Sequence, residues 1–188
     1  MNLSLCGHSP PFCNLQSDPT MPTPMTTPQW PRLPMSTDDC AQVAGALQPV
    51  LVALIDLSLQ AKQAHWNVFG TQFLSVHEKL DDVVETARKF GDVVAERIVQ
   101  LGHSPDGRAK TIASTSPLND YSDGFHGVPD TLTRTADRLK TVADTVRAAH
   151  KAVDETDPPT GDYLNAVSQE IEEHLWMFQA MEKPAPAP

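Results

Sequence analysis

The sequence has few cysteines, few basic residues and no long apolar run, and each shortage argues against a class of protein. Three cysteines among 188 residues show no repeated spacing, which argues against a disulfide-stabilised secreted protein. With 14 Lys and Arg against 24 Asp and Glu, the formal charge is −10, which disfavours general attraction to nucleic-acid phosphates and anionic membranes. The longest apolar run, VLVALI, is far shorter than the roughly 18 residues that span a membrane. We therefore expect a cytoplasmic protein that does not enter a membrane.

The two ends of the chain differ in composition from its middle. Residues 1–35 are rich in Pro, Ser, Thr and Met and contain very few charged residues, so they bury too little apolar surface to offset the entropy lost on ordering. We predict a disordered N-terminal tail, with Met35 as an alternative start of translation. The folded domain is expected at 36–183, followed by a short Pro- and Ala-rich tail at 184–188.

The middle of the chain has the apolar spacing of four amphipathic helices. Apolar residues recur at steps of three or four over about 38–65, 72–101, 129 up to the DPPTG sequence, and 161–182, which is the helical period. The connection 103–127 is rich in turn formers, so we expect a long crossover with one short helix. No segment alternates like a strand. The fold class predicted is all-α, a four-helix bundle with one long crossover.

Four side chains that can bind metal ions lie on the second predicted helix: His77, Asp81, Asp92 and Glu96. At 100° per residue their directions fall within about 100° of arc, so they share one face. The residues of each successive pair are four positions apart and can hold one ion together. The two pairs, however, are separated by about 16 Å along the helix, whereas metal–ligand bonds are about 2 Å long. One chain therefore cannot close a site from both pairs.

A two-fold dimer can close it. The residue numbers add to 173 for His77 with Glu96 and again for Asp81 with Asp92, so two antiparallel copies of this helix would bring both pairs together at both ends. His65, at the end of the first helix, adds a ligand beside His77. Two imidazoles and three carboxylates suit ferrous iron or manganese and, less selectively, zinc. A merely solvated acidic face is the alternative, but the shared sum and His65 favour a metal site.

Three stretches of this region, DLSLQAKQAHWNVFG, FLSVHEKLDDVVETA and GDVVAERIVQLG, together with the later TGDYLNAVSQEIEEHLWMFQA, resemble the signature of Dps proteins, the mini-ferritins of starved bacteria. The resemblance covers about 40–182. It implies ferritin-like bundles with a short helix in the long connection, assembled as a hollow dodecamer. It also implies ferroxidase sites at two-fold interfaces that oxidise Fe(II), preferably with hydrogen peroxide, and storage of ferric mineral inside the shell.

The resemblance also implies roles for individual residues. His65, His77 and Asp81 match the ligands of one subunit, and Asp92 and Glu96 match those of its neighbour. Trp66 matches a tryptophan beside the site that, by family analogy, donates an electron or quenches a radical; simple interface packing is the alternative. Two further acidic sets have candidate roles. The first could seed mineral on the inner surface, with an ordinary solvated face as the alternative: Glu78, Asp82 and Glu85. The second could line iron-entry pores: Asp154, Asp157 and Asp162.

The chain departs from well-known Dps proteins in its ends. Those proteins bind DNA through basic mobile tails, whereas here no lysine precedes Lys62 and Arg32 is the only arginine before it. We expect weak or absent DNA binding at physiological salt. A nucleoid-associated DNA-binding shell with little iron activity remains the alternative function. A ferritin with a di-iron site inside each bundle is set aside because the sequence has no Glu-x-x-His.

The remaining metal-binding residue types have no pattern that supports a site. A soft-metal site from Cys6, His8 and Cys13 is left open, although three ligands in a disordered tail are better explained by chance. The other histidines are expected to be surface or packing residues: His103, His126, His150 and His174.

Overall fold

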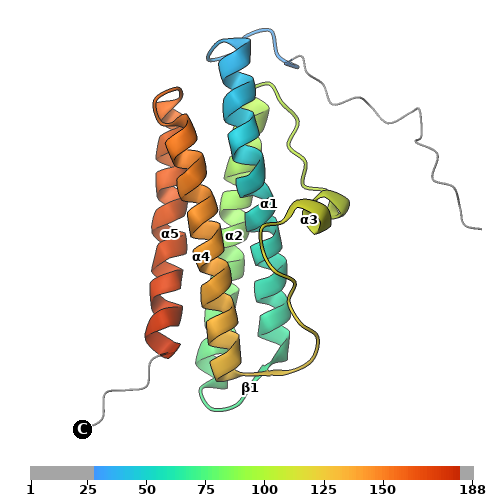
Figure 1. The fold of residues 1–188 in the computed structure, drawn as a ribbon, viewed down its shortest axis with the longest axis vertical. Coiled ribbons are helices and arrows are strands. Elements are labelled where there is room, and N and C mark those ends of the chain that lie inside the picture. Colours follow the sequence, from blue (N-terminus) through green and yellow to red (C-terminus); the bar gives the residue numbers. More distant parts are fainter. Residues whose placement is uncertain (1–27, 183–188) are drawn as a thin grey trace, which may run out of the picture.

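The computed structural model describes residues 28–182, in which four long helices, one short helix and two very short strands form a bundle (Figure 1). This confirms the predicted all-α bundle with a short helix in the long connection. The predicted site at Cys6, His8 and Cys13 and the C-terminal tail lie outside the described residues. The elements are α1 (Thr37–Asn67), β1 (Val68–Phe69), α2 (Phe73–Gln100), α3 (Ala109–Thr115), β2 (His126–Gly127), α4 (Val128–Val153) and α5 (Pro158–Glu182).

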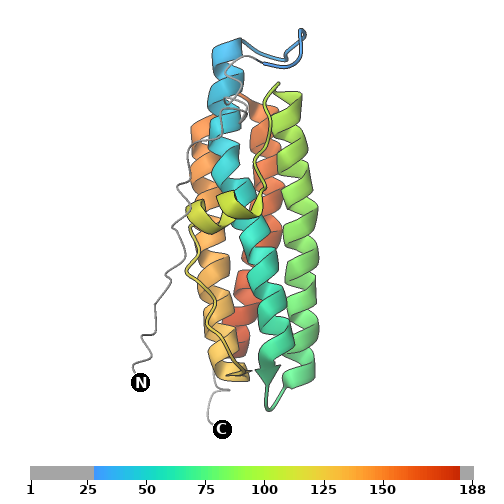
Figure 2. The same ribbon diagram turned by 90° about the vertical axis from the view of Figure 1, so that its right-hand side faces the viewer.

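The order of the helices follows from two hairpins and one long crossover. α1 and α2 form one antiparallel pair and α4 and α5 the other, and the crossover carrying α3 runs from one end of the bundle to the other (Figures 1 and 2). α3 packs outside α1 rather than in the core. One face of α2 packs into the bundle, and the opposite face is exposed in the subunit.

The start of α1 and the turn before α2 are formed by a capping residue and a glycine. Ser36 caps α1 by accepting a hydrogen bond from the backbone N–H of Asp39 at 3.1 Å, and acidic residues occupy the positive end of the helix dipole. The chain turns between α1 and α2 at Gly70, which has a φ of +110°, a conformation that glycine adopts without strain. Both features agree with the predicted start and end of these helices.

Two details of the connections differ from the sequence prediction. The DPPTG sequence was expected to end the third helix, but α4 ends at Val153 and α5 begins at Pro158; proline is accepted in a first helical turn, where its missing N–H is not needed. In addition, β1 and β2 pair in parallel, with Val68 opposite His126. Strands of two residues are too short to show an alternating pattern, so they could not be predicted from periodicity.

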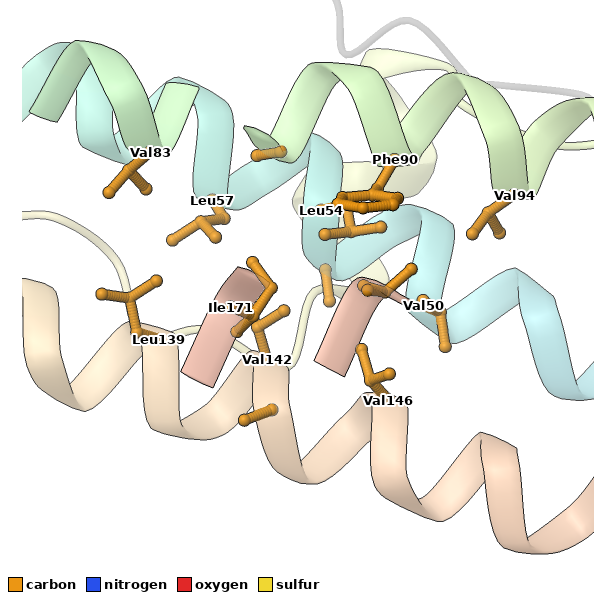
Figure 3. Close-up of a cluster of buried hydrophobic side chains, with 14 of the residues drawn as sticks. Val50, Leu54, Leu57, Val83, Phe90, Val94, Leu139, Val142, Val146 and Ile171 are labelled. Carbon is orange, nitrogen blue, oxygen red and sulfur yellow. The ribbon is translucent and has the colours of Figure 1, made fainter. Parts of the chain in front are cut away.

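The core is formed by the inward faces of all four long helices (Figure 3). α1 contains an 18-residue window with a mean hydropathy of 1.6, which is apolar enough for a membrane span, but 56% of that window is buried inside the bundle. We therefore interpret α1 as the core helix of the bundle. The side chains at the centre of the core are Val50, Leu54 and Leu57 of α1, Val83, Phe90 and Val94 of α2, Leu139, Val142 and Val146 of α4 and Ile171 of α5.

Residues 28–33, called the N-terminal strap below, lie against the C-terminal end of α2. The indole Nε1 of Trp30 donates to the carbonyl oxygen of Val99 at 2.9 Å, and the N–H of Gln29 donates to the carbonyl oxygen of Gly102 at 2.9 Å. A Cβ at position 102 would lie 2.8 Å from that of Pro28, so only glycine fits there. The strap thus donates to the carbonyl oxygen of Val99 in the last turn of α2, which also accepts from the N–H of Gly102 at 2.9 Å, and to that of Gly102 just beyond the helix. Ordered contacts thus begin before the domain boundary predicted at residue 36.

Candidate metal centre

The end of α1 and the start of α2 bring His65 and His77 into direct contact. Their rings are stacked with centroids 3.6 Å apart, and each Nδ1 lies 2.9 Å from the backbone carbonyl oxygen of the other residue. A carbonyl oxygen can only accept, so each Nδ1 is the donor and each neutral ring keeps an unprotonated Nε2. An unprotonated imidazole nitrogen whose ring is fixed by its other nitrogen is a prepared metal ligand.

Asp81 completes this half of the candidate site. Its Oδ1 lies 3.2 Å from Nδ1 of His65 and 2.5 Å from Nζ of Lys62. The hydrogen bond from Lys62 is the main reason why the pKa of Asp81 is lowered, with smaller contributions from the nearby imidazoles. Because 48% of its side chain is exposed, the carboxylate is accessible from solvent. The ammonium group of Lys62 therefore lies where a metal cation could bind, beside a carboxylate that is ionised at neutral pH.

Asp92 and Glu96 are exposed on α2, on the same face as His77 and Asp81. Asp92 also borders a pocket of about 370 Å³ between α1, α2 and the crossover. In the described residues 28–182, no three His, Cys, Asp or Glu side chains come together closely enough to hold a metal ion. The subunit thus presents two separate half-sites on one helix face.

Trp66 follows His65 directly and projects from the end of α1 with 64% of its surface exposed. A tryptophan with so much exposed surface is not needed for packing within the subunit. Its position beside His65 therefore leaves both a redox role and interface packing as hypotheses.

The predicted mineral-seeding residues are separated by the fold. Asp82 and Glu85 border a pocket of about 410 Å³ between α2 and α5, where α5 contributes Glu170, Glu173 and His174. Glu78 is exposed on α2 and does not belong to this group. His174 is buried and forms a hydrogen bond of 2.9 Å with Thr86, and burial lowers its pKa, so it is the packing residue that the sequence suggested.

The three predicted pore residues do not share one environment. Asp154 and Asp162 are exposed at the α4–α5 turn. The Asp157 side chain is only 4% exposed and accepts a hydrogen bond from Nη2 of Arg97 at 2.7 Å. A carboxylate neutralised inside the subunit is not available to an aqueous passage, so this placement corrects the prediction for Asp157. The sequence could not reveal it, because Arg97 lies 60 positions away.

Two side-chain pairings near or outside the candidate site are not apparent from the sequence. In the sequence, Lys62 is noticeable only as part of the DLSLQAKQAHWNVFG stretch. Its contact with Asp81 depends on how α1 and α2 pack. His126, expected to be a surface or packing residue, has its Nδ1 2.8 Å from Oδ2 of Asp130. The spacing of four residues was the available signal for this second pair.

Comparison with known proteins identifies the family. A family model described as a ferritin-like domain matches residues 44–183. The "DNA protection during starvation protein" of Agrobacterium fabrum is 39% identical over 139 residues, which cover 73% of this chain and 86% of that protein. The "DNA protection during starvation protein 2" of Deinococcus radiodurans is 38% identical over 144 residues, 77% of this chain and 60% of that protein.

Solved structures agree with the sequence comparisons. Dps92 from Deinococcus radiodurans superposes with a TM-score of 0.76 at 37% identity, over 79% of this chain and 90% of that one. Dps from Microbacterium arborescens, solved in a high iron form, gives a TM-score of 0.76 at 31% identity, over 80% of this chain and 98% of that one. The fold and the matches define a ferritin-like protein, and within that class the chain belongs to the Dps family.

Proposed function

We propose that this protein is a ferroxidase and iron-storage protein that oxidises Fe(II) at sites shared between two subunits, preferably with hydrogen peroxide. The observation that carries the proposal is the arrangement of two half-sites on one face of α2. His65, His77 and Asp81 lie together at its start, and Asp92 and Glu96 are exposed towards its end. An antiparallel second copy of α2 would join each half-site to the complementary one.

The proposed set of imidazole and carboxylate ligands suits Fe(II) as the substrate. Imidazoles bind Fe(II), and hard carboxylate oxygens favour the Fe(III) product. Each peroxide molecule takes one electron from each of two Fe(II) ions and two protons from solvent, and its O–O bond breaks to give two water molecules. No hydroxyl radical is released when both electrons are transferred at one site. Mn(II) and Zn(II) are expected to compete for the same ligands.

The residues around the proposed iron site have supporting roles. Trp66 supplies an electron or quenches a radical beside the site, because it is exposed next to His65. Asp82 and Glu85, which share a pocket with acidic residues of α5, and Glu78 collect Fe(III). Asp154 and Asp162, exposed at the α4–α5 turn, line entry pores. The assembly is a hollow dodecamer built from two-fold dimers in the cytoplasm.

DNA protection is the second candidate function, and the names of the relatives favour it. The chain has a formal charge of −10, and Arg32 is its only Lys or Arg before Lys62. Since the affinity of proteins for DNA depends on basic contacts to phosphates, we propose that direct DNA binding is weak or absent at physiological salt. Protection would then come from removal of Fe(II) and peroxide rather than from coating DNA or from association with the nucleoid.

The shared site can be tested with mixed subunits. One variant carries His77→Ala and Asp81→Ala, and the other carries Asp92→Ala and Glu96→Ala. Neither variant alone can form a complete site, but a mixed dimer contains one complete site and one empty one. With random pairing, co-expression should restore about one quarter of the wild-type sites, measured as ferric absorbance after adding peroxide to anaerobic Fe(II)-loaded protein.

The matched control removes another His–Asp pair spaced by four residues, His126 and Asp130, and should oxidise iron like the wild type. Light scattering verifies that every variant assembles. The proposal is wrong if the variant lacking Asp92 and Glu96 oxidises iron as fast as the wild type, or if the co-expressed variants regain no activity.

A further inference from the structure

The end of the crossover and the first turn of α4 carry a serine, a histidine and an aspartate in one chain of hydrogen bonds. Nδ1 of His126 lies 2.8 Å from Oδ2 of Asp130, and its Nε2 lies 3.3 Å from Oγ of Ser122. A carboxylate only accepts, so Nδ1 of the neutral ring carries the proton and Nε2 accepts from the serine hydroxyl. A nucleophile, a base and a group that orients the base are thus arranged in the order that activates a serine.

The surrounding fold restricts the position of the His126 ring. His126 belongs to β2, and the pairing of this strand with β1 places it opposite Val68. Its ring meets the ring of Tyr121 edge-on, with 5.5 Å between the centroids, and only 12% of its side chain is exposed. A base that is fixed before the substrate binds loses little freedom during the reaction.

Asp130 is ionised at neutral pH. Nε of Arg134 donates to its Oδ2 at 2.7 Å, and this hydrogen bond is the main reason why the pKa of Asp130 is lowered, against the opposing effect of burial and with a smaller contribution from His126. A carboxylate in this place stabilises the imidazolium that forms when the base takes a proton. The backbone carbonyl oxygen of Ser122, 3.2 Å from Nε2, accepts from the protonated ring.

The nucleophile of this cluster is open to solvent. Ser122 is exposed, and Phe125, which directly precedes His126, is 77% exposed. An exposed aromatic ring in the same segment as an accessible nucleophile suits the aryl group of an ester. The open position favours small esters with a good leaving group over large substrates that need an enclosing pocket. None of the candidate iron ligands belongs to the cluster, which lies on the crossover and α4.

We propose that Ser122, His126 and Asp130 form a hydrolytic site for small aryl esters, with Ser122 as nucleophile, His126 as general base and Asp130 as the positioning residue. Oγ of Ser122 bonds to the ester carbonyl carbon while its proton passes to Nε2 of His126. The ester C–O bond breaks, and the imidazolium returns that proton to the oxygen of the leaving phenol. Water, activated by the same base, then hydrolyses the acyl-serine to the carboxylic acid and restores Ser122. The step needs no metal ion, so this activity is separate from the proposed iron oxidation.

Hydrolysis of p-nitrophenyl acetate by the full-length protein tests the proposal. Ser122→Ala and His126→Ala should each lower kcat/KM at least about tenfold, because a positioned base contributes about 10²–10⁴-fold to such reactions. Asp130→Asn should lower kcat with little change in KM, because it removes the carboxylate that holds the reactive tautomer and does not touch the substrate. The assay contains a chelator, so that a metal-bound water at the candidate metal centre does not contribute.

Two matched controls separate this cluster from general surface reactivity. His150 also lies four positions from an aspartate, with its Nε2 3.7 Å from Oδ1 of Asp154, and Ser114 is exposed on α3 with its Oγ donating to the carbonyl oxygen of Thr111. His150→Ala and Ser114→Ala should hydrolyse the ester like the wild type. Circular dichroism verifies the folding of every variant.

Covalent labelling identifies the nucleophile directly. Diisopropyl fluorophosphate forms a phosphorus–oxygen bond with the Oγ of an activated serine and releases fluoride, and peptide mass spectrometry locates the adduct. The wild type should be labelled at Ser122, and His126→Ala should be labelled there at least about tenfold more slowly. If His126→Ala does not fold, His126→Gln replaces it, and the position of the label in the wild type needs no variant.

Labelling at Ser122 that depends on His126, together with slower ester hydrolysis in Ser122→Ala, supports the proposal. It is overturned if Ser122 carries no adduct, if the adduct forms as fast without His126, or if the wild type hydrolyses the ester no faster than Ser122→Ala.

Discussion

His65 and His77 orient each other, because each Nδ1 donates to the backbone carbonyl oxygen of the other residue at 2.9 Å. The contact joins the last turn of α1 to the first turns of α2 and stacks the two rings. Both Nε2 atoms are thereby kept unprotonated in the neutral rings. The two rings are thus held in fixed positions with one unprotonated nitrogen each, as the proposed metal site requires.

This mutual contact predicts non-additive effects of mutation. His65→Ala and His77→Ala should each weaken Co(II) binding by about 10–100-fold, because each removes one ligand and also frees the other ring. The double variant should lose less than the sum of the two free-energy changes, since the second substitution removes a ring that is already misoriented. Anaerobic Co(II) titrations followed by visible absorbance measure both effects. His150→Ala is the control, and strictly additive losses would contradict the mutual orientation.

Lys62 should compete with metal ions for Asp81. In Lys62→Met the hydrogen bond that lowers the pKa of Asp81 is lost, but the carboxylate stays ionised at neutral pH and no longer faces an ammonium group. Affinity for Co(II) at low salt should rise about two- to fivefold, a modest gain because the contact is partly exposed. Isothermal titration at neutral pH measures it. Lys110→Met, an exposed change on α3, is the matched control, and an affinity equal to or below that of the wild type would argue against competition.

Periodic and local signals in the sequence predicted most of the fold. The four long helices follow from apolar spacing, and the placement of His77, Asp81, Asp92 and Glu96 on one face of α2 follows from helix geometry alone. Long-range pairs were not predictable in this way. Lys62 meets Asp81 only through the packing of α1 on α2, and the pairing of Arg97 with Asp157 joins α2 to the turn before α5. No local pattern encodes such contacts.

The N-terminal strap is a second case in which the sequence pattern did not predict a long-range contact. Its composition is typical of disordered segments, yet Trp30 donates to the carbonyl oxygen of Val99 at the end of α2, which also accepts from the N–H of Gly102. Two hydrogen bonds, from Trp30 to Val99 and from Gln29 to Gly102, join the strap to the end of α2, and no local sequence pattern indicates them.

The hydrogen bond of Trp30 should contribute measurably to stability. Trp30→Phe keeps an aromatic ring but removes the N–H donor, so the carbonyl of Val99 keeps only its backbone donor from Gly102, and the free energy of unfolding should fall by about 1 kcal/mol. Urea unfolding followed by circular dichroism measures the change. Trp176→Phe, at a residue of α5 that is 63% exposed, is the control and should leave the free energy of unfolding within about 0.5 kcal/mol of the wild type. Equal losses in both variants would show that the strap hydrogen bond does not stabilise the fold.

The Arg97–Asp157 pair predicts a specific dependence of stability on pH. Burial by itself would raise the pKa of Asp157, but hydrogen bonds from Thr160 and Arg97 outweigh it, and the net effect is a lowered pKa. The unfolded value is about 3.9, so the unfolded chain binds a proton more readily than the folded one. The contribution of this carboxylate is therefore complete above about pH 5, begins to fall near the unfolded value and is lost as the pH falls through the folded value.

Asp157→Asn removes this titration and leaves Arg97 without its buried partner. At neutral pH the variant should be less stable by about 3–5 kcal/mol, because a buried charge is left uncompensated. The deficit should shrink between about pH 5 and pH 3, since the wild type loses the same interaction on protonation. Urea unfolding across this pH range measures it, with Asp137→Asn at an exposed position of α4 as the control for general acid effects. A deficit that stays constant with pH would mean that the ionised form of Asp157 is not what Arg97 and Thr160 stabilise, and that the turn before α5 depends on packing alone.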